Sequence, residues 1–149
     1  MDSDDFWFPD KAKIQLNEFK DKEVMLVCSN ALIYKNRIAV RKYFHKEYNE
    51  ITTKAMLKNN LVINSSVIIR ATALKLIGGY VFDFQHVGME DYATWLRISR
   101  IGKVKYINKC LISYSLSSDS FSANIGQPKF SHLISEFNKW ESKLNLKEI

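Results

Sequence analysis

The chain has only two cysteines among its 149 residues, Cys28 and Cys110. Two cysteines cannot supply the disulfide framework of a small secreted domain, and their spacing matches no zinc-binding pattern. Each lies in an apolar run, so we expect buried thiols in a reducing, cytoplasmic compartment. No apolar run is long enough to cross a bilayer, and the first residues lack the basic-then-apolar pattern of a signal peptide. A peripheral place at the inner face of the membrane stays open.

Other absences exclude several enzyme classes. The sequence has no glycine-rich phosphate loop and no Ser-His-Asp order, and its three histidines, His45, His86 and His132, have no metal-binding spacing. There is no internal repeat and no low-complexity segment. Hydrophobic residues make up 46% of the chain and charged residues 26%, which is typical of one globular domain.

Charge of one sign is in moderate excess, with a formal net charge of +6. Such a balance suits nucleic acid, anionic lipid or a phosphorylated substrate as a partner. The cations are spread along the chain, and the densest group lies in Arg37–Lys46. We favour a solvated surface; the alternative is a non-catalytic basic module that binds an anionic partner.

Helices are predicted from apolar spacing and from end signals. Phe8, Ala12, Leu16 and Phe19 recur at helical spacing after an acidic stretch and Pro9. The other predicted helices are Glu50–Lys58, Ala71–Ile77 with a left-handed end at Gly78-Gly79, Glu90–Ile101 ending at Gly102, and a last helix from about Pro128 with an apolar stripe of Phe130, Leu133, Ile134, Phe137 and Leu144.

Strands are predicted from short apolar runs between these helices. They are Glu23–Ala31, Leu61–Arg70, Lys103–Ile107 and Leu111–Leu116, and Ile33–Tyr48 is expected to be a loop or short hairpin. The first element is expected to be a helix. Strands and helices mix along the chain, which predicts an α/β domain.

Two acidic clusters are candidates for chemistry. Asp2-Ser3-Asp4-Asp5 puts three carboxylates within four residues, where they either cap the following helix or hold a hard divalent cation. Glu90 and Asp91 open an amphipathic helix, where they either favour the helix N-terminus or supply a general base. Phe6, Trp7 and Phe8 lie beside the first cluster and Tyr92 and Trp95 beside the second; such rings either pack in the core or line a sugar site.

Together, and in this order, the motifs resemble family-2 glycosyltransferases of the GT-A type. The stretches that carry the resemblance are Asp2–Lys11 with Gln15, Ile63–Arg70, Leu76–Tyr80 with Phe82-Asp83, Gly88–Tyr92 with Trp95-Leu96-Arg97, and Tyr114 with Ser118–Ser122. The match therefore runs from Asp2 to about Ser122.

The resemblance implies roles for individual residues. Asp4 is implied as the principal ligand of a divalent metal, Mn²⁺ or Mg²⁺, with Asp2 assisting. Asp91 is implied as the general base of an inverting sugar transfer, with Glu90 positioning the acceptor or the Asp91 carboxylate. Trp7, Trp95 and Arg97 are expected at the donor and acceptor sites, where Trp95 and Arg97 also suit bracing of the helix.

The same resemblance implies an incomplete fold. Residues 1–122 correspond to the catalytic, acceptor-side half of a GT-A domain, a Rossmann-like mixed sheet with flanking helices, and residues 123–149 form a C-terminal amphipathic helix. The nucleotide-binding strands expected before Asp2 are missing, which leaves a sheet edge open to a second chain. The implied partners are a nucleotide-sugar donor and a glycan or lipid-linked acceptor of cell-envelope polysaccharide synthesis, with no specific nucleic acid.

Overall fold

The computed structural model describes residues 5–35, 38–82, 88–115 and 130–144. Its strands are β1 (Phe6–Trp7), β2 (Val24–Lys35), β3 (Ile38–Lys42), β4 (Ile68–Ile69) and β5 (Lys103–Ser115). Its helices are α1 (Lys11–Glu18), α2 (Thr53–Met56), α3 (Ala71–Leu76), α4 (Glu90–Ile101) and α6 (Phe130–Ser142), with a 3-10 turn η1 (Asn64–Ser66). This mixed open sheet with flanking helices confirms the predicted α/β class and is compatible with a Rossmann-like arrangement.

The centre of the sheet is the long parallel pair of β2 and β5. The pairing begins at Val24 opposite Lys103 and ends at Tyr34 opposite Ser115. β1 adds to the outer edge of β5, while β3 and β4 share the other edge of β2, all three antiparallel. Nearly every residue of β2 from Val24 to Ile33 is buried, because helices cover both faces of this strand.

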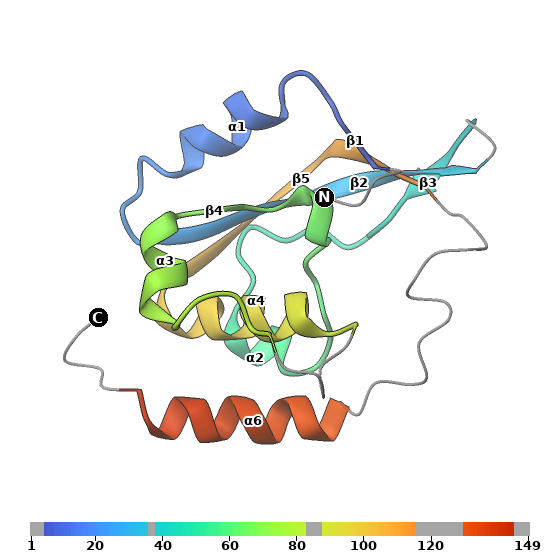
Figure 1. Ribbon diagram of the computed structural model, residues 1–149. Coiled ribbons are helices and arrows are strands. Elements are labelled where there is room, and N and C mark those ends of the chain that lie inside the picture. The colour runs from blue at the N-terminus through green and yellow to red at the C-terminus, as the bar shows by residue number, and fades with distance from the viewer. Residues whose placement is uncertain (1–4, 36–37, 83–87, 116–129, 145–149) are drawn as a thin grey trace.

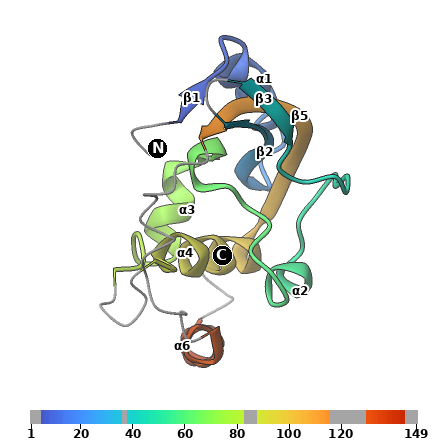
Figure 2. The ribbon, with the colours of Figure 1, turned by 90° about the vertical axis from the view of Figure 1, so that its right-hand side faces the viewer.

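The helices form layers around the sheet. Figure 1 shows α1 over one face and α4 with α2 against the other, and Figure 2 shows α6 as an outer layer beyond α4. Trp95, Leu96 and Ile98 of α4 are buried against the sheet, and Leu133 and Phe137 of α6 join the same core. This confirms the predicted apolar stripe of the last helix at two of its positions.

The predicted apolar face of the first helix is wrong. Lys11 and Gln15 are fully buried, whereas Ala12 is exposed and Leu16 is 58% exposed. Gln15 explains why this face of the helix meets the sheet, because its Nε2–H₂ group donates to the Val27 carbonyl at 3.0 Å and to the Ser66 carbonyl at 2.8 Å. Buried carbonyls need hydrogen-bond donors, and here an amide side chain supplies them.

The segment predicted as a strand over Leu61–Arg70 is mostly irregular around the short turn η1, and only Ile68–Ile69 joins the sheet. Ser66 explains the change, because its hydroxyl donates to the Ile63 carbonyl at 2.7 Å and accepts from the Ser29 N–H at 3.2 Å. Such local bonds compete with a strand ladder.

Three other predictions need correction: the two strands after Gly102, the first element of the chain and the helix over Glu50–Lys58. The two strands expected after Gly102 are one strand, β5, whose partner strand shifts register around Asn30. The Asn108 side chain bonds both the N–H and the carbonyl of Tyr48, which accommodates the polar interruption. A short strand, β1, precedes the first helix, and the helix expected over Glu50–Lys58 is shortened to α2. The hairpin alternative for Ile33–Tyr48 is confirmed by β2 and β3.

Glycines mark two helix ends, for different reasons. Gly78 and Gly79 have φ values of +86° and +96°, which confirms the predicted left-handed end of α3. Gly102 has an extended backbone instead, and a Cβ atom there would lie 2.3 Å from Met25 Cγ and 3.0 Å from the Glu23 carbonyl oxygen. Close packing therefore requires glycine between α4 and β5.

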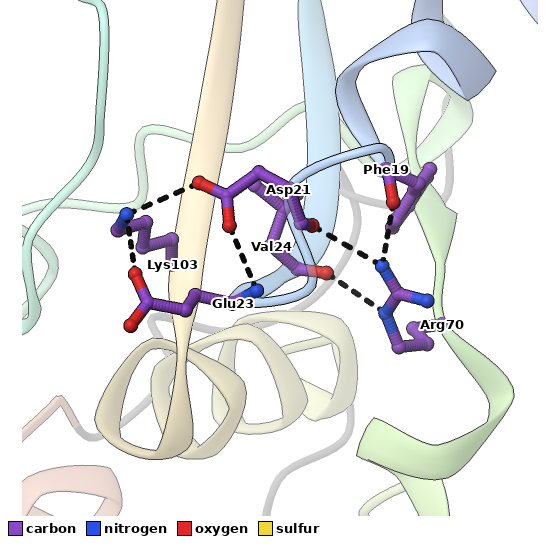
Figure 3. A network of polar contacts seen from close by, with 6 residues as sticks. All are labelled: Phe19, Asp21, Glu23, Val24, Arg70 and Lys103. Carbon is purple, nitrogen blue, oxygen red and sulfur yellow. Dashed lines mark hydrogen bonds and ion pairs between the residues drawn. The ribbon is translucent and has the colours of Figure 1, made fainter.

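Arg70 joins the start of β2 to the loop after α1, as Figure 3 shows. Its guanidinium donates to the carbonyls of Val24 at 3.0 Å, Phe19 at 3.0 Å and Asp21 at 3.3 Å. On the other side of the same loop, Lys103 forms ion pairs with Asp21 and Glu23. The hydrogen bond from the Glu23 N–H, and after it the bond from Lys103, lower the pKa of the Asp21 carboxyl. One arginine therefore bonds two carbonyls of the loop after α1 and the carbonyl of the first residue of β2.

We predict that Arg70→Met lowers the free energy of unfolding by about 1–3 kcal/mol, because it removes charge-assisted hydrogen bonds to backbone carbonyls. Urea unfolding measures the change. Lys75→Met, at an exposed position of α3, is the matched control and should stay within about 0.5 kcal/mol of the wild type. Equal stability of the two variants would contradict the role given to Arg70.

Candidate functional site

Asp5 is the part of the first acidic cluster that the structure describes. Its side chain is only 3% exposed, and its Oδ1 atom accepts from the Ser115 N–H at 3.2 Å. β1 follows directly, with Phe6 opposite Ser113 and Trp7 opposite Ile112. The acidic cluster therefore leads into the sheet at the carboxyl end of β5. Asp2 and Asp4 themselves lie outside the described residues.

The second acidic cluster lies at the first turn of α4. The Glu90 carboxylate accepts from the Gly88 N–H at 2.7 Å, and Gly88 has a φ of +83° that favours glycine. The Asp91 carboxylate is half-buried, and its Oδ1 atom accepts from the Tyr92 N–H at 2.6 Å. Thr94 accepts from the Val81 N–H and donates to the Glu90 carbonyl, so the turn is fixed from both sides.

The α4–β5 connection brings these clusters to one end of the sheet. Gly102 is the only residue between the helix and the strand, so α4 folds back along the sheet antiparallel to β5. Figure 1 shows β1 and the first turn of α4 toward the same end of the sheet, where β5 finishes. The carboxyl ends of parallel strands are where ligands bind in open α/β sheets. We take this end as the candidate active site.

Trp7 of β1 lies at the same end of the sheet. Its ring is 47% exposed, and its Nε1–H donates to the Ser65 carbonyl of η1 at 2.9 Å. The Lys11 ammonium lies 3.8 Å from the ring centroid, within the range of a cation–π contact. An exposed face on a ring that is anchored in this way is suited to stack against a sugar.

Lys11 is the functional candidate that sequence reasoning missed. Its side chain is inaccessible to solvent, and its Nζ atom has no hydrogen-bond acceptor among the residues that the structure describes. Burial lowers the pKa of Lys11 to about 8. Burial also raises the pKa of the nearby Cys28 thiol, so that thiol stays neutral and provides no counter-charge. The available signal was a lysine and a glutamine four residues apart, which share one helix face.

Trp95 and Arg97 lie on α4 beyond its first turn. Trp95 is 2% exposed and packs edge-to-face against Tyr80, with 6.0 Å between ring centroids. Arg97 is half-buried, with its guanidinium carbon 5.3 Å from the Trp140 ring centroid of α6. Burial lowers the pKa of Arg97. Both residues thus pack within the described structure and brace α4.

A divalent cation would need Asp2 and Asp4. Within residues 5–35, 38–82, 88–115 and 130–144, no group of three or more His, Cys, Asp or Glu side chains could hold a metal ion. Asp5 is bonded to the backbone of β5 and is almost inaccessible. Carboxylate oxygens are the ligands that Mg²⁺ and Mn²⁺ prefer, so the donor type of Asp2 and Asp4 fits a divalent metal ion.

Among the helices of the described part of the chain, none has the length and apolar character to cross a membrane.

Comparisons with known proteins point to sugar transfer. No protein-family model matches the chain. The Escherichia coli protein WfaP, a UDP-Glc:alpha-D-GlcNAc-diphosphoundecaprenol beta-1,3-glucosyltransferase, is 32% identical over 143 residues, which are 95% of this chain and 53% of WfaP. WfgD of Escherichia coli, named for the same reaction, is 30% identical over 126 residues, which are 83% of this chain and 47% of WfgD. The chain spans about half the length of these curated relatives, and the similarity supports a glycosyltransferase.

We predict that Lys11→Met raises the free energy of unfolding at pH 7 by about 1–3 kcal/mol, because it removes a buried ammonium without an acceptor. The gain should shrink as the pH rises from about 8 toward 10.5, since the wild-type lysine loses its proton in the folded state before the unfolded chain does.

Urea unfolding between pH 7 and 9.5 measures this difference, with Lys13→Met at an exposed position of α1 as the control. An unchanged gap between wild type and Lys11→Met over that range would rule out the lowered pKa.

Proposed function

We propose that this chain carries the catalytic half of a glycosyltransferase that moves glucose from UDP-glucose to a lipid-linked GlcNAc diphosphate acceptor. The observation that carries the proposal is the similarity to two enzymes named for this reaction, which extends over 95% of the chain in one case. The family-2, GT-A character rests on the order of the sequence motifs.

In this proposal, the carboxylates of Asp4 and Asp2 would hold a divalent metal for the donor diphosphate. A bound cation would stabilise the negative charge that develops on the leaving nucleoside diphosphate. Asp5 anchors the chain that carries them, because its bond to the Ser115 N–H ties the acidic cluster to the carboxyl end of β5. Trp7 offers its exposed ring face to a sugar at the same end.

Asp91 is the proposed general base. It takes the proton from the acceptor hydroxyl while that oxygen attacks the anomeric carbon, and the nucleoside diphosphate leaves from the opposite face. A β-linkage made from an α-linked nucleotide sugar requires this inversion. The rigid first turn of α4 suits the role, because Glu90 and Thr94 fix the backbone while Asp91 remains half-exposed.

Asp91→Asn tests the general base. We expect kcat for transfer of radiolabelled glucose to the lipid-linked acceptor to fall by about 10²–10⁴-fold, because the amide cannot accept the proton. The affinity for UDP should be unchanged, since Asp91 does not touch the donor diphosphate in this scheme. Asp10→Asn, at an exposed carboxylate with no capping bond, is the control and should transfer like the wild type. Transfer at the wild-type rate by Asp91→Asn would refute the assignment.

Asp4→Ala tests the metal site separately. Calorimetric titration with UDP in the presence of Mn²⁺ should show binding to the wild-type chain, and little binding either to Asp4→Ala or after chelation of the metal. The physical reason is that the diphosphate would lose its charge-neutralising cation. Equal UDP affinity with and without Mn²⁺ would remove the metal from the mechanism.

A further inference from the structure

The hairpin of β2 and β3 carries exposed aliphatic side chains that the transfer chemistry does not use. All five residues of β3 are exposed. Ile38 is 69% exposed and Val40 is 58% exposed, although both are aliphatic residues of a regular strand. Figure 1 shows this hairpin projecting at the end of the sheet opposite α3.

Cations flank these aliphatic side chains. Lys35, opposite Ile38 in the hairpin, is exposed, and so are Arg41 and Lys42 of β3. None of the three forms an ion pair with an acid in the described part of the chain. The hairpin thus combines a positive field with apolar side chains at one projecting edge.

Protection of a free strand edge explains the cations of β3 but not its exposed aliphatic residues. Lysine and arginine on an edge strand discourage pairing with other chains. Ile38 and Val40 have the opposite effect, because exposed β-branched residues favour such pairing. A surface that is both cationic and aliphatic matches the interface of an anionic bilayer, where aliphatic groups enter the acyl boundary and long cationic side chains reach the headgroups. Nucleic acid would use the cations but not the aliphatic groups.

We propose that the β2–β3 hairpin docks on a bilayer that contains anionic phospholipid, through Ile38 and Val40 in the acyl boundary and Lys35, Arg41 and Lys42 at the headgroups. The inference rests on the proposed function, because a lipid-linked acceptor lies in a membrane. It adds the surface that meets that membrane. Such docking confines the protein to the plane in which its acceptor diffuses.

Vesicle cosedimentation of the full chain tests the proposal without donor or acceptor. The vesicles are phosphatidylcholine alone, or phosphatidylcholine with phosphatidylglycerol at about three to one. We expect much tighter binding to the anionic vesicles than to phosphatidylcholine alone. Arg41→Gln/Lys42→Gln should weaken it about 30-fold, from roughly 1 kcal/mol for each cation near an anionic surface. Ile38→Ser/Val40→Ser should also weaken binding, and should remove the part that persists at 1 M salt, where charges are screened beyond about 3 Å.

The matched control is Leu16→Ser/Lys13→Gln on α1, which removes an exposed aliphatic group and a cation from another surface. It should bind vesicles like the wild type. Equal losses in the control and hairpin variants would overturn the assignment to the hairpin, and so would unaltered binding by both hairpin variants. Binding to a nucleic-acid duplex without binding to vesicles would overturn the bilayer as partner.

The two proposals can fail separately. Asp91→Asn should bind vesicles like the wild type, because Asp91 lies on α4 and not on the hairpin. Loss of vesicle binding in the hairpin variants together with unaltered transfer by Asp91→Asn would contradict the catalytic proposal alone. Normal vesicle binding by the hairpin variants together with loss of transfer in Asp91→Asn would contradict the docking proposal alone. Far-UV circular dichroism checks that each variant is folded.

Discussion

The parallel pairing of β2 with β5, enclosed by helices on both faces, is the constraint on which the site depends. Parallel neighbours need a crossover connection, and in this chain α4 is its last element. Since Gly102 alone joins α4 to β5, the helix must fold back along the strand that follows it. Its first turn, with Glu90 and Asp91, is thereby carried toward the end of the sheet where β5 finishes and β1 enters. The position of the candidate site is therefore a consequence of topology and not of any one side chain.

Polar groups inside the structure, more than apolar ones, decide how α1 sits on this sheet. Gln15 donates to carbonyls of β2 and η1, Trp7 donates to η1, and Asp5 accepts from the last residue of β5. Three segments far apart in sequence are thus tied together beside the acidic cluster. A fully buried Lys11 lies in the same layer. A buried charge without a hydrogen-bond acceptor lowers the free energy of unfolding. Lys11 therefore destabilises the fold close to the proposed site.

Sequence patterns correctly predicted the helices that bury an apolar face. The predictions were wrong where a buried side chain forms hydrogen bonds with the backbone of another segment. The period of α4 and the stripe of α6 were readable because burial of one face dominates their free energy. The orientation of α1 was not, since a hydrophobic stripe of Ala12 and Leu16 gave no sign that Gln15 would face the sheet. Similarly, the hydrogen bonds of the Ser66 hydroxyl favour the turn η1 where the sequence predicted a strand. For the candidate site, Glu90 and Asp91 could be predicted at a helix start, and the period of α4 placed Trp95 on its packed face. The buried state of Lys11 depends on tertiary packing that no local pattern records.

The central proposal is that Asp2 and Asp4, as ligands of a metal, serve one site together with the Asp91 carboxylate. Paramagnetic broadening of backbone amide NMR signals by Mn²⁺ tests this claim most directly. We predict strong broadening at Ser115 and at the first turn of α4, and much weaker broadening at Gly102, which lies at the far end of a helix about 18 Å long. Broadening that is strongest near Gly102, or that reaches Ser115 but spares Asp91, would contradict a shared site.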